Sequence, residues 1–288
     1  MRSPVRAGPG SPALQPNHSL DEVSGAVSEG PNVVRWARAI RQLVGEPLVA
    51  VKLPSKHAAQ ADALVGQHVA AVDTHGKHLL VHLSDGHTLH CHGLMQGYWH
   101  VGRPGMLPDG EAAVRVRLRT AEWEALFLHG PVAQLLSGAE LAQHAKLQAL
   151  GPDVMSERFD RAEAGRRVRA AGAEIAEAIV DQNVVAGIGN TYKSEALFVA
   201  GIDPRRSAAD IAPEELAALW DVVIPLMWDE ANCEGEWSTL PAELRGRGER
   251  HWVYRRSGRP CLKCGSRIRL VRQGKFNRAT YLCTQCQR

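Results

Sequence analysis

Four cysteines near the C-terminus restrict the fold of this chain more than any other feature. Two residues separate Cys261 from Cys264. After 18 further residues, the pair Cys283 and Cys286 repeats that spacing. Each pair presents two sulfurs at one edge of a tetrahedron, so a single zinc ion can hold two hairpins that are too small to bury a core. The pattern predicts a zinc-ribbon hairpin, with a redox-active cysteine pair as the alternative.

The segment that carries these cysteines is strongly basic. Arg245–Arg288 contains 13 Lys or Arg residues against one acid, Glu249, which gives +12 in a chain whose net charge is +3. Such a block is typical of a surface that binds a polyanion. A solvated tail is the alternative, but aromatic residues between the charges indicate a folded module: Trp252, Tyr254, Phe276 and Tyr281.

The composition sets the size and the environment of the fold. The chain has 288 residues, of which 44% are hydrophobic, enough for one or two domains with their own cores. No apolar run approaches the roughly 20 residues that a membrane-spanning helix needs, and the N-terminus has no apolar stretch of signal-peptide length. We therefore expect a cytoplasmic protein without a membrane partner.

A glycine-rich turn marks the second half of the chain. Gly187 and Gly189 interrupt an apolar helical run, and Asn190-Thr191 can cap the helix that follows. Such a turn exposes backbone N–H groups at the positive end of a helix dipole, and Asn190 and Lys193 stand beside them. The arrangement predicts a phosphate-binding site. A helix hairpin whose glycines only permit close packing is the alternative.

Changes in composition divide the chain into four predicted segments. Residues 1–27 are rich in Pro, Gly and Ser, which predicts a disordered tail. Residues 28–150 begin with a helix and continue with short alternating segments, which predicts an antiparallel β-sandwich flanked by that helix. Helical periodicity dominates residues 151–245, and residues 246–288 form the zinc module. The predicted fold class is therefore α+β.

Hydrophobic periodicity also predicts the individual elements. A first helix runs from Pro31 to about Val44, where Gly45 ends it. The expected strands are Val69–Asp73, His78–Leu83, His87–His92, Val114–Leu118 and Val132–Leu136. The later helices are expected at about 138–150, 162–181, 192–200 and 213–231.

The stretch Asp181–Pro204 reads DQNVVAGIGNTYKSEALFVAGIDP and resembles the helix-two-turn-helix signature of the Fpg/Nei family of DNA glycosylases. The resemblance covers nearly all of the chain from Ser28 onward. It implies that Asn190 binds a DNA phosphate, with Lys193 in the same site, and that zinc is the ion of the cysteine cluster. The implied partner is damaged DNA, bound by a monomer.

Three further DNA contacts follow from the same resemblance. Arg278, five positions before Cys283, is similar to the family's DNA-binding arginine. Lys77 lies in a segment similar to the family strand whose lysine helps hold DNA at the lesion. The loop Leu94–Trp99 resembles the one that fills the space left by an extruded base, with Met95 as the wedge. The alternatives are a solvated strand residue for Lys77 and core packing for Met95.

The start of the resemblance departs from the family pattern. Family members typically begin with Pro-Glu-Gly-Pro-Glu, and their terminal amine attacks the sugar carbon C1′, expels the base and forms a Schiff base. Here Ser28–Asn32 reads SEGPN, so Glu29 matches the family's acid whereas Ser28 replaces the proline. An amide nitrogen inside a chain cannot form a Schiff base. Initiation at Val27 would expose a Ser28 amine; otherwise Lys77 carries residual lyase chemistry or the protein only binds DNA.

The loop Phe127–Val132 lacks the Arg-Arg-Phe-Gly of enzymes for oxidised purines. The chain is therefore more similar to the Nei, or endonuclease VIII, branch, which implies oxidised pyrimidines as substrates. Two hypotheses result. The first is a DNA glycosylase and abasic-site lyase that cleaves the strand through a Schiff base, with Ser28, Glu29 and Lys77 as catalytic residues. The second is a catalytically silent DNA-damage-binding paralogue.

Overall fold

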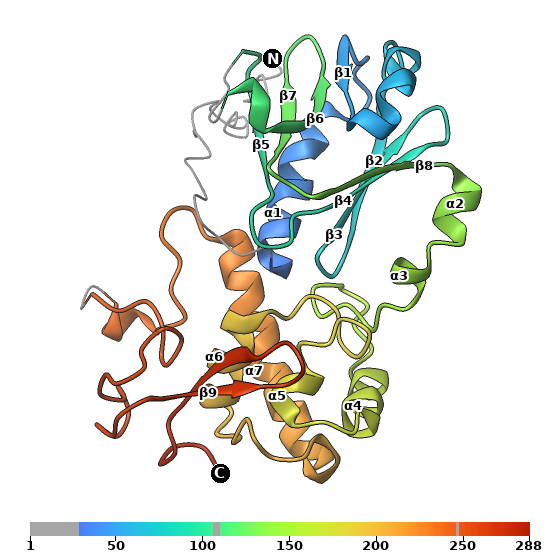
Figure 1. Cartoon of the computed structure of the whole chain (residues 1–288). Coiled ribbons are helices and arrows are strands. Elements are labelled where there is room, and N and C mark those ends of the chain that lie inside the picture. Colours follow the sequence, from blue (N-terminus) through green and yellow to red (C-terminus); the bar gives the residue numbers. More distant parts are fainter. Residues whose placement is uncertain (1–28, 106–109, 246–247) are drawn as a thin grey trace, which may run out of the picture.

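A computed structural model describes residues 29–105, 110–245 and 248–288. The predicted tail 1–27 and Ser28 lie outside these residues. Figure 1 shows a sheet-rich half above a helical half, with the C-terminal hairpin against the helical half. No helix within the described ranges has the length and apolar character needed to cross a bilayer.

The sheet-rich half is a sandwich of two four-stranded antiparallel sheets, as the sequence predicted. One sheet has the order β1-β6-β7-β5 and the other the order β2-β3-β4-β8. The strands are β1 (Ala50–Lys52), β2 (Val69–His75), β3 (His78–Leu83), β4 (Thr88–His92), β5 (Tyr98–Gly102), β6 (Val114–Arg119), β7 (Glu124–Leu128) and β8 (Val132–Leu136).

The alternation of side chains fixes which face of each strand is buried. In β3, Leu79, Val81 and Leu83 are at most 3% exposed and belong to the first hydrophobic core. The alternate positions of β3 therefore face the outside of the sandwich. Helix α1 (Gly30–Ile40) covers the core with an apolar stripe that includes Trp36 and Ile40.

The helical half encloses a second core, and α1 contacts both. Val33 packs in the first core and its neighbour Val34 against the second. The helices of this half and of its connection to the sandwich are α2 (Gly138–Ala142), α3 (Ala145–Gln148), α4 (Arg161–Ala170), α5 (Ile175–Ala178), α6 (Asn190–Val199) and α7 (Pro213–Asn232). Short 3₁₀ helices lie at Arg41–Leu43, Ser55–Gln60, Asp62–Leu64, Glu111–Ala113, Ala208–Asp210 and Ala242–Leu244.

Three helix predictions were wrong. The helix expected at 138–150 is split into α2 and α3, because His144 caps the start of α3 by accepting a hydrogen bond from the N–H of Leu147. The helix expected at 162–181 is split into α4 and α5, because Gly172 has a φ of +64° between them. The expected cap Asn190-Thr191 is instead the start of α6, whose N-cap is Gly189. The side chain of Asn190 is hydrogen-bonded to Lys193 and so is not available as a cap.

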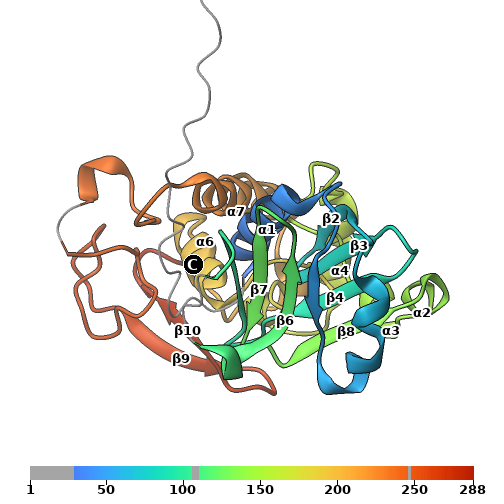
Figure 2. The ribbon, with the colours of Figure 1, turned by 90° about the horizontal axis from the view of Figure 1, so that it is seen from above.

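The C-terminal segment forms an antiparallel hairpin of β9 (Arg269–Gln273) and β10 (Arg278–Leu282). A small third core joins the hairpin to α6, since Phe198 of α6 packs with Val253, Ile268 and two of the cysteines. Figure 2 shows the hairpin beside α6, on the side away from α7.

Candidate nucleic-acid interface and metal centre

Three basic side chains from distant parts of the sequence converge where the two halves meet. Lys77 lies in the β2–β3 turn, Lys193 in α6 and Arg278 at the start of β10. Lys193 is 1% exposed and Lys77 is 9% exposed. The positive charge of Arg278 lowers the pKa of both lysines, which indicates that the three groups share one region. Of the predicted DNA-binding residues, the fold therefore brings together these three and Asn190.

The ammonium group of Lys193 is held by neutral acceptors. Its Nζ donates to Asn190 Oδ1 at 3.0 Å and to the carbonyl oxygen of Ala279 at 2.9 Å. Burial, followed by repulsion from Arg278, lowers the pKa of Lys193 to about 7. Because Asn190 Oδ1 accepts from Lys193, the amide presents its Nδ2 hydrogens to a further acceptor. This cluster of cations and amide donors is suited to a phosphate.

The turn that carries Lys77 is fixed against the helical half. The backbone N–H of Gly76 donates to Asp153 Oδ2 at 2.9 Å, and a Cβ at Gly76 would lie 2.8 Å from the Cβ of Ala186. Burial lowers the pKa of Lys77 to about 8, with Glu29 opposing the shift and Arg278 adding to it. Lys77 is therefore not the solvated strand residue of the alternative interpretation.

Glu29 contributes a buried carboxyl group to the same region. Its side chain is 3% exposed, and Oε1 accepts a hydrogen bond of 3.0 Å from the backbone N–H of Thr191. Among the described residues, Oε2 has no hydrogen-bond partner. Gly189 packs flat on this carboxyl, since a Cβ there would lie 2.6 Å from Oε1. The carboxyl thus has one fixed oxygen and one available oxygen, next to the position of Ser28 in the chain.

The predicted wedge loop lies between β4 and β5. Met95 is 69% exposed and Leu94 is 48% exposed, so the core-packing alternative for Met95 is wrong. The backbone N–H of Leu94 donates to Nδ1 of His92 at 2.9 Å, which ties the loop to the end of β4. The loop presents apolar side chains beside the turn of Lys77.

Four cysteine sulfurs gather at the base of the C-terminal hairpin. All four Sγ atoms of Cys261, Cys264, Cys283 and Cys286 lie within 4.8 Å of one another. The separations are 3.9 Å for Cys261–Cys286 and 3.5 Å for Cys264–Cys283. A tetrahedral Zn²⁺ with Zn–S bonds of about 2.3 Å needs S–S edges of about 3.8 Å, so this group can hold a metal ion.

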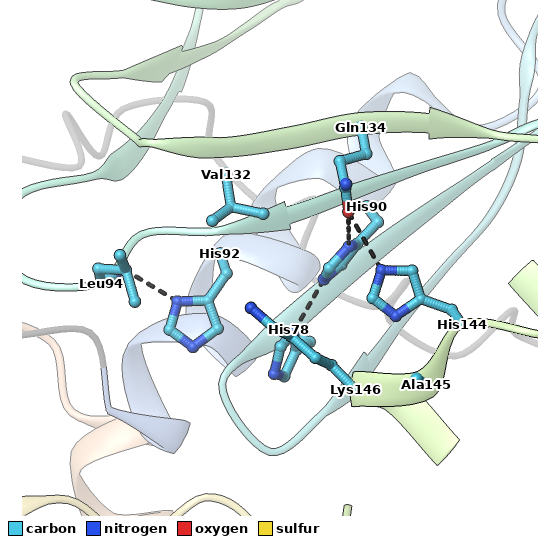
Figure 3. A pocket seen from close by; sticks show the side chains of 9 residues that line it. All are labelled: His78, His90, His92, Leu94, Val132, Gln134, His144, Ala145 and Lys146. Carbon is cyan, nitrogen blue, oxygen red and sulfur yellow. Dashed lines mark hydrogen bonds between the residues drawn. The ribbon is translucent and has the colours of Figure 1, made fainter. Parts of the chain in front are cut away.

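The sequence did not predict a pocket lined by histidines, which lies beside the wedge loop and the strands β3, β4 and β8. Its volume is about 500 Å³ (Figure 3). His78 and His90 join their rings through a 2.8 Å hydrogen bond, and Gln134 Oε1 accepts from His90 at 3.2 Å and from His144 at 3.1 Å. Burial lowers the pKa of His78 to about 2 and that of His90 to about 4. The recurrence of histidine at alternate strand positions was the available signal.

Two further glutamates were also missed, Glu195, which is buried, and Glu230, which is half-buried. Glu195 of α6 accepts hydrogen bonds from the backbone N–H groups of Trp252, Val253 and Tyr254, and so fixes the segment that leads into the cysteine hairpin. Glu230 of α7 accepts from the hydroxyl of Tyr192, and burial raises its pKa to about 7. Each glutamate is a single acid within a helical sequence, so no motif pointed to the hydrogen bonds that Glu195 and Glu230 make.

The fold, together with the cluster formed by Lys77, Lys193 and Arg278, defines a DNA-binding protein of the helix-two-turn-helix class. Family models match residues 27–132 as a formamidopyrimidine-DNA glycosylase N-terminal domain and residues 150–239 as a formamidopyrimidine-DNA glycosylase H2TH domain.

Named relatives agree with these models. The chain is 35% identical over 265 residues to the probable endonuclease 8 2 of Streptomyces coelicolor, covering 90% of this chain and 93% of the relative. It is 31% identical to endonuclease 8 of Escherichia coli K12, covering 90% and 99%. A crystal structure of Lactococcus lactis Fpg with abasic-site DNA has the same fold, with a TM-score of 0.75, 21% identity, and coverage of 90% and 99%. The chain belongs to the formamidopyrimidine-DNA glycosylase/endonuclease 8 (Fpg/Nei) family.

Proposed function

We propose that this protein is a DNA-repair glycosylase and abasic-site lyase that removes oxidised bases, pyrimidines in particular, and acts in the cytoplasm as a monomer. The observation that carries this proposal is the placement of Glu29, one of whose buried oxygens has no hydrogen-bond partner within residues 29–105, 110–245 and 248–288, in the same region as three converging cations. An acid for proton transfer and a clamp for a sugar-phosphate chain are the two parts that the reaction needs. The match covers 93% and 99% of the length of two relatives named endonuclease 8. This coverage favours an enzyme over a silent damage-binding protein.

The cations and the amide would hold the DNA backbone. Lys193, Asn190 Nδ2 and Arg278 lie on two elements that pack together, α6 and β10, so they can contact phosphates of one strand. Lys77 would contact the same strand from the other half of the protein. Grip from both sides lets the nucleotide between the contacts swing outward, and Met95 would then enter the vacated space in the stack.

The proposed nucleophile is the amine of Ser28, exposed by initiation at Val27. The family model for the N-terminal domain begins its match at residue 27, which supports this start. The amine nitrogen bonds to C1′ while the bond from C1′ to the base breaks; the amine gives up a proton and the departing base gains one. The bond from C1′ to the ring oxygen O4′ then breaks, O4′ takes up a proton, and the nitrogen lone pair completes the C1′=N bond of a protonated Schiff base. Removal of a C2′ proton next expels the 3′ phosphate, so β-elimination cleaves the strand on the 3′ side. Glu29 is suited to receive and return the proton through its available oxygen.

We propose zinc as the metal of the cysteine cluster. Four sulfurs at tetrahedral separations fit a structural zinc site, in which all ligands come from the protein. Zinc would crosslink the two cysteine pairs and would take no part in the reaction. The cysteines would fix the base of the hairpin and, through it, the position of Arg278.

Borohydride trapping on DNA with an abasic site tests this function. Protein that begins at Ser28 is compared with the chain that begins at Met1, and the adduct is located by peptide mass. We expect a covalent adduct on Ser28 in the first protein only. An adduct on Lys77 would transfer the lyase role to that lysine. Tight binding without any adduct would support the silent paralogue and reject the enzyme.

A further inference from the structure

An exposed aromatic ring stands at the tip of the cysteine-based hairpin. Phe276 lies in the turn between β9 and β10 and is 67% exposed. Large exposed apolar side chains are few among the described residues, and Leu94 and Met95 of the wedge loop are two others. Phe276 is two residues from Arg278, so the ring stands beside the proposed phosphate clamp. Single exposed apolar residues are common on protein surfaces, so the case for a role of Phe276 comes from its support and its charged neighbours.

The backbone that leads to this ring is fixed at the end of β9. Gln273 at the end of β9 is buried, and its Nε2 donates to Glu174 Oε2 at 2.6 Å and to the carbonyl oxygen of Pro204 at 3.0 Å. Gly274 packs on Glu177 so closely that a Cβ would lie 2.5 Å from its Oε2. The root of the turn, at Gln273 and Gly274, is therefore attached to the helical half.

The turn itself is also closed by hydrogen bonds. The backbone N–H of Asn277 donates to the carbonyl oxygen of Gly274 at 2.9 Å, and Arg272 Nη1 donates to the carbonyl oxygen of Asn277 at 3.1 Å. A ring on a rigid support loses little conformational entropy when it contacts a ligand. The hairpin thus presents a preorganised aromatic group.

The charges around the ring determine what it can bind. Lys275 Nζ lies 5.0 Å from the ring centroid and Arg278 Cζ lies 5.4 Å from it. An apolar partner surface that covered the ring would also remove these two cations from water at a large cost. A nucleic-acid strand offers both of the required chemistries, since its bases have apolar faces and its phosphates pair with the cations.

We propose that Phe276 stacks on a base of the DNA strand whose phosphate Arg278 holds. This inference rests on the proposed function and adds a contact to it. Extrusion of a nucleotide uncovers the faces of the bases that flank it, and every base has a π-face, so the contact tolerates any sequence and steadies the DNA beside the extruded nucleotide. Phe276 is thus a DNA-positioning residue, distinct in chemistry from the phosphate clamp.

The test separates stacking from charge by the salt dependence of binding. Affinity for duplex DNA with a stable abasic-site analogue is measured by fluorescence anisotropy at several salt concentrations for wild type, F276A, F276W, R278A and L270A. Leu270 is the matched control, because it is an apolar residue of the same hairpin and is 40% exposed. For F276A we expect a loss of about 5- to 150-fold at every salt concentration, with the slope of log affinity against log salt unchanged.

The other variants complete the pattern. F276W should bind like wild type because it keeps an aromatic face, and L270A should also bind like wild type. R278A should lower the slope by about one, since it removes one phosphate contact. F276A affinity within twofold of L270A would overturn the inference, as would a slope for F276A that falls like that of R278A. If the wild type itself failed to bind the DNA, the proposed function would be rejected along with the inference.

Discussion

At the corner formed by α6 and β10 the basic groups are fixed by the protein, whereas the carboxyl beside them is only half satisfied. Lys193 donates to Asn190 and to the backbone of β10, while Glu29 has one bonded oxygen and one oxygen without a partner in the described ranges. In the proposed function the corner holds a DNA strand, and the carboxyl of Glu29 transfers a proton. Binding and chemistry should therefore be separable by substitution.

The largest expected effect comes from E29Q. Glutamine keeps an oxygen for the N–H of Thr191 but cannot exchange a proton at neutral pH, so we expect excision to slow by about 10²- to 10⁴-fold. DNA affinity should stay within about twofold, because Glu29 is not part of the cationic clamp. Single-turnover cleavage of DNA with an oxidised pyrimidine measures the first effect and anisotropy the second. An equal loss of rate and affinity would show that the two regions are not separable.

Removal of the metal should act on binding through the hairpin. Chelation frees the base of β9 and β10, so Arg278 loses its position and Lys193 loses its acceptor in β10; we expect DNA affinity to fall on the order of 100-fold. The two larger cores contain none of the four cysteines and should still unfold cooperatively on heating.

A matched control for metal removal is C233S, since Cys233 lies outside the cysteine cluster. This variant should keep its metal content and its DNA affinity, whereas C283S should lose both. Full affinity in metal-free protein would contradict the role assigned to the hairpin.

The buried lysine of the corner should make stability depend on pH. Lys193 has a pKa of about 7 in the folded protein against about 10.4 when unfolded, so between these values the unfolded chain holds a proton that the folded one lacks. Lys193 should therefore make stability rise with pH from 7, contributing about 2 kcal/mol by pH 9. In K193M this contribution should be lost and only the smaller rise from Lys77, whose pKa is lowered to about 8, should remain. Urea unfolding at both pH values would detect the difference. An identical rise in K193M would place its source elsewhere.

A smaller effect is expected from the histidine pocket. His90 is 1% exposed and its pKa is lowered to about 4, so below pH 6.5 the unfolded chain takes up a proton before the folded one. The melting temperature should fall as the pH drops from 6.5 towards 4, and H90Q should reduce this fall by a few degrees. H87Q, at the Ser84–His87 turn, is the control and should follow wild type.

Local pattern carried most of the fold prediction. The strands at His78–Leu83 and Val132–Leu136 agree with β3 and β8, because alternation over a two-residue period is a property of the strand alone. The start of α6 was predicted two residues late, since the bond between Asn190 and Lys193 competes with capping. The proposed domain boundaries near residues 150 and 245 stay predictions.

The candidate site depended more on tertiary packing. The cysteine spacing was enough to predict the four-sulfur cluster, and motif resemblance was enough to select Asn190 and Arg278. Burial of Lys77 could not be predicted, because it arises where Gly76 packs on Ala186, more than 100 residues away. The histidine pocket likewise requires the register that pairs β4 with β8.

The central claim is that the junction holds buried lysines with lowered pKa values, which gain their positive charge when a phosphate arrives. Calorimetric titration of abasic-analogue DNA at pH 8, in two buffers of different ionisation enthalpy, counts the protons taken up on binding. A phosphate should raise the pKa of Lys193 and Lys77 from about 7 and 8, so we expect an uptake of about 1.4 protons, of which only the Lys77 part, about 0.5, should remain in K193M. Tight binding by the wild type with no proton uptake would contradict the account.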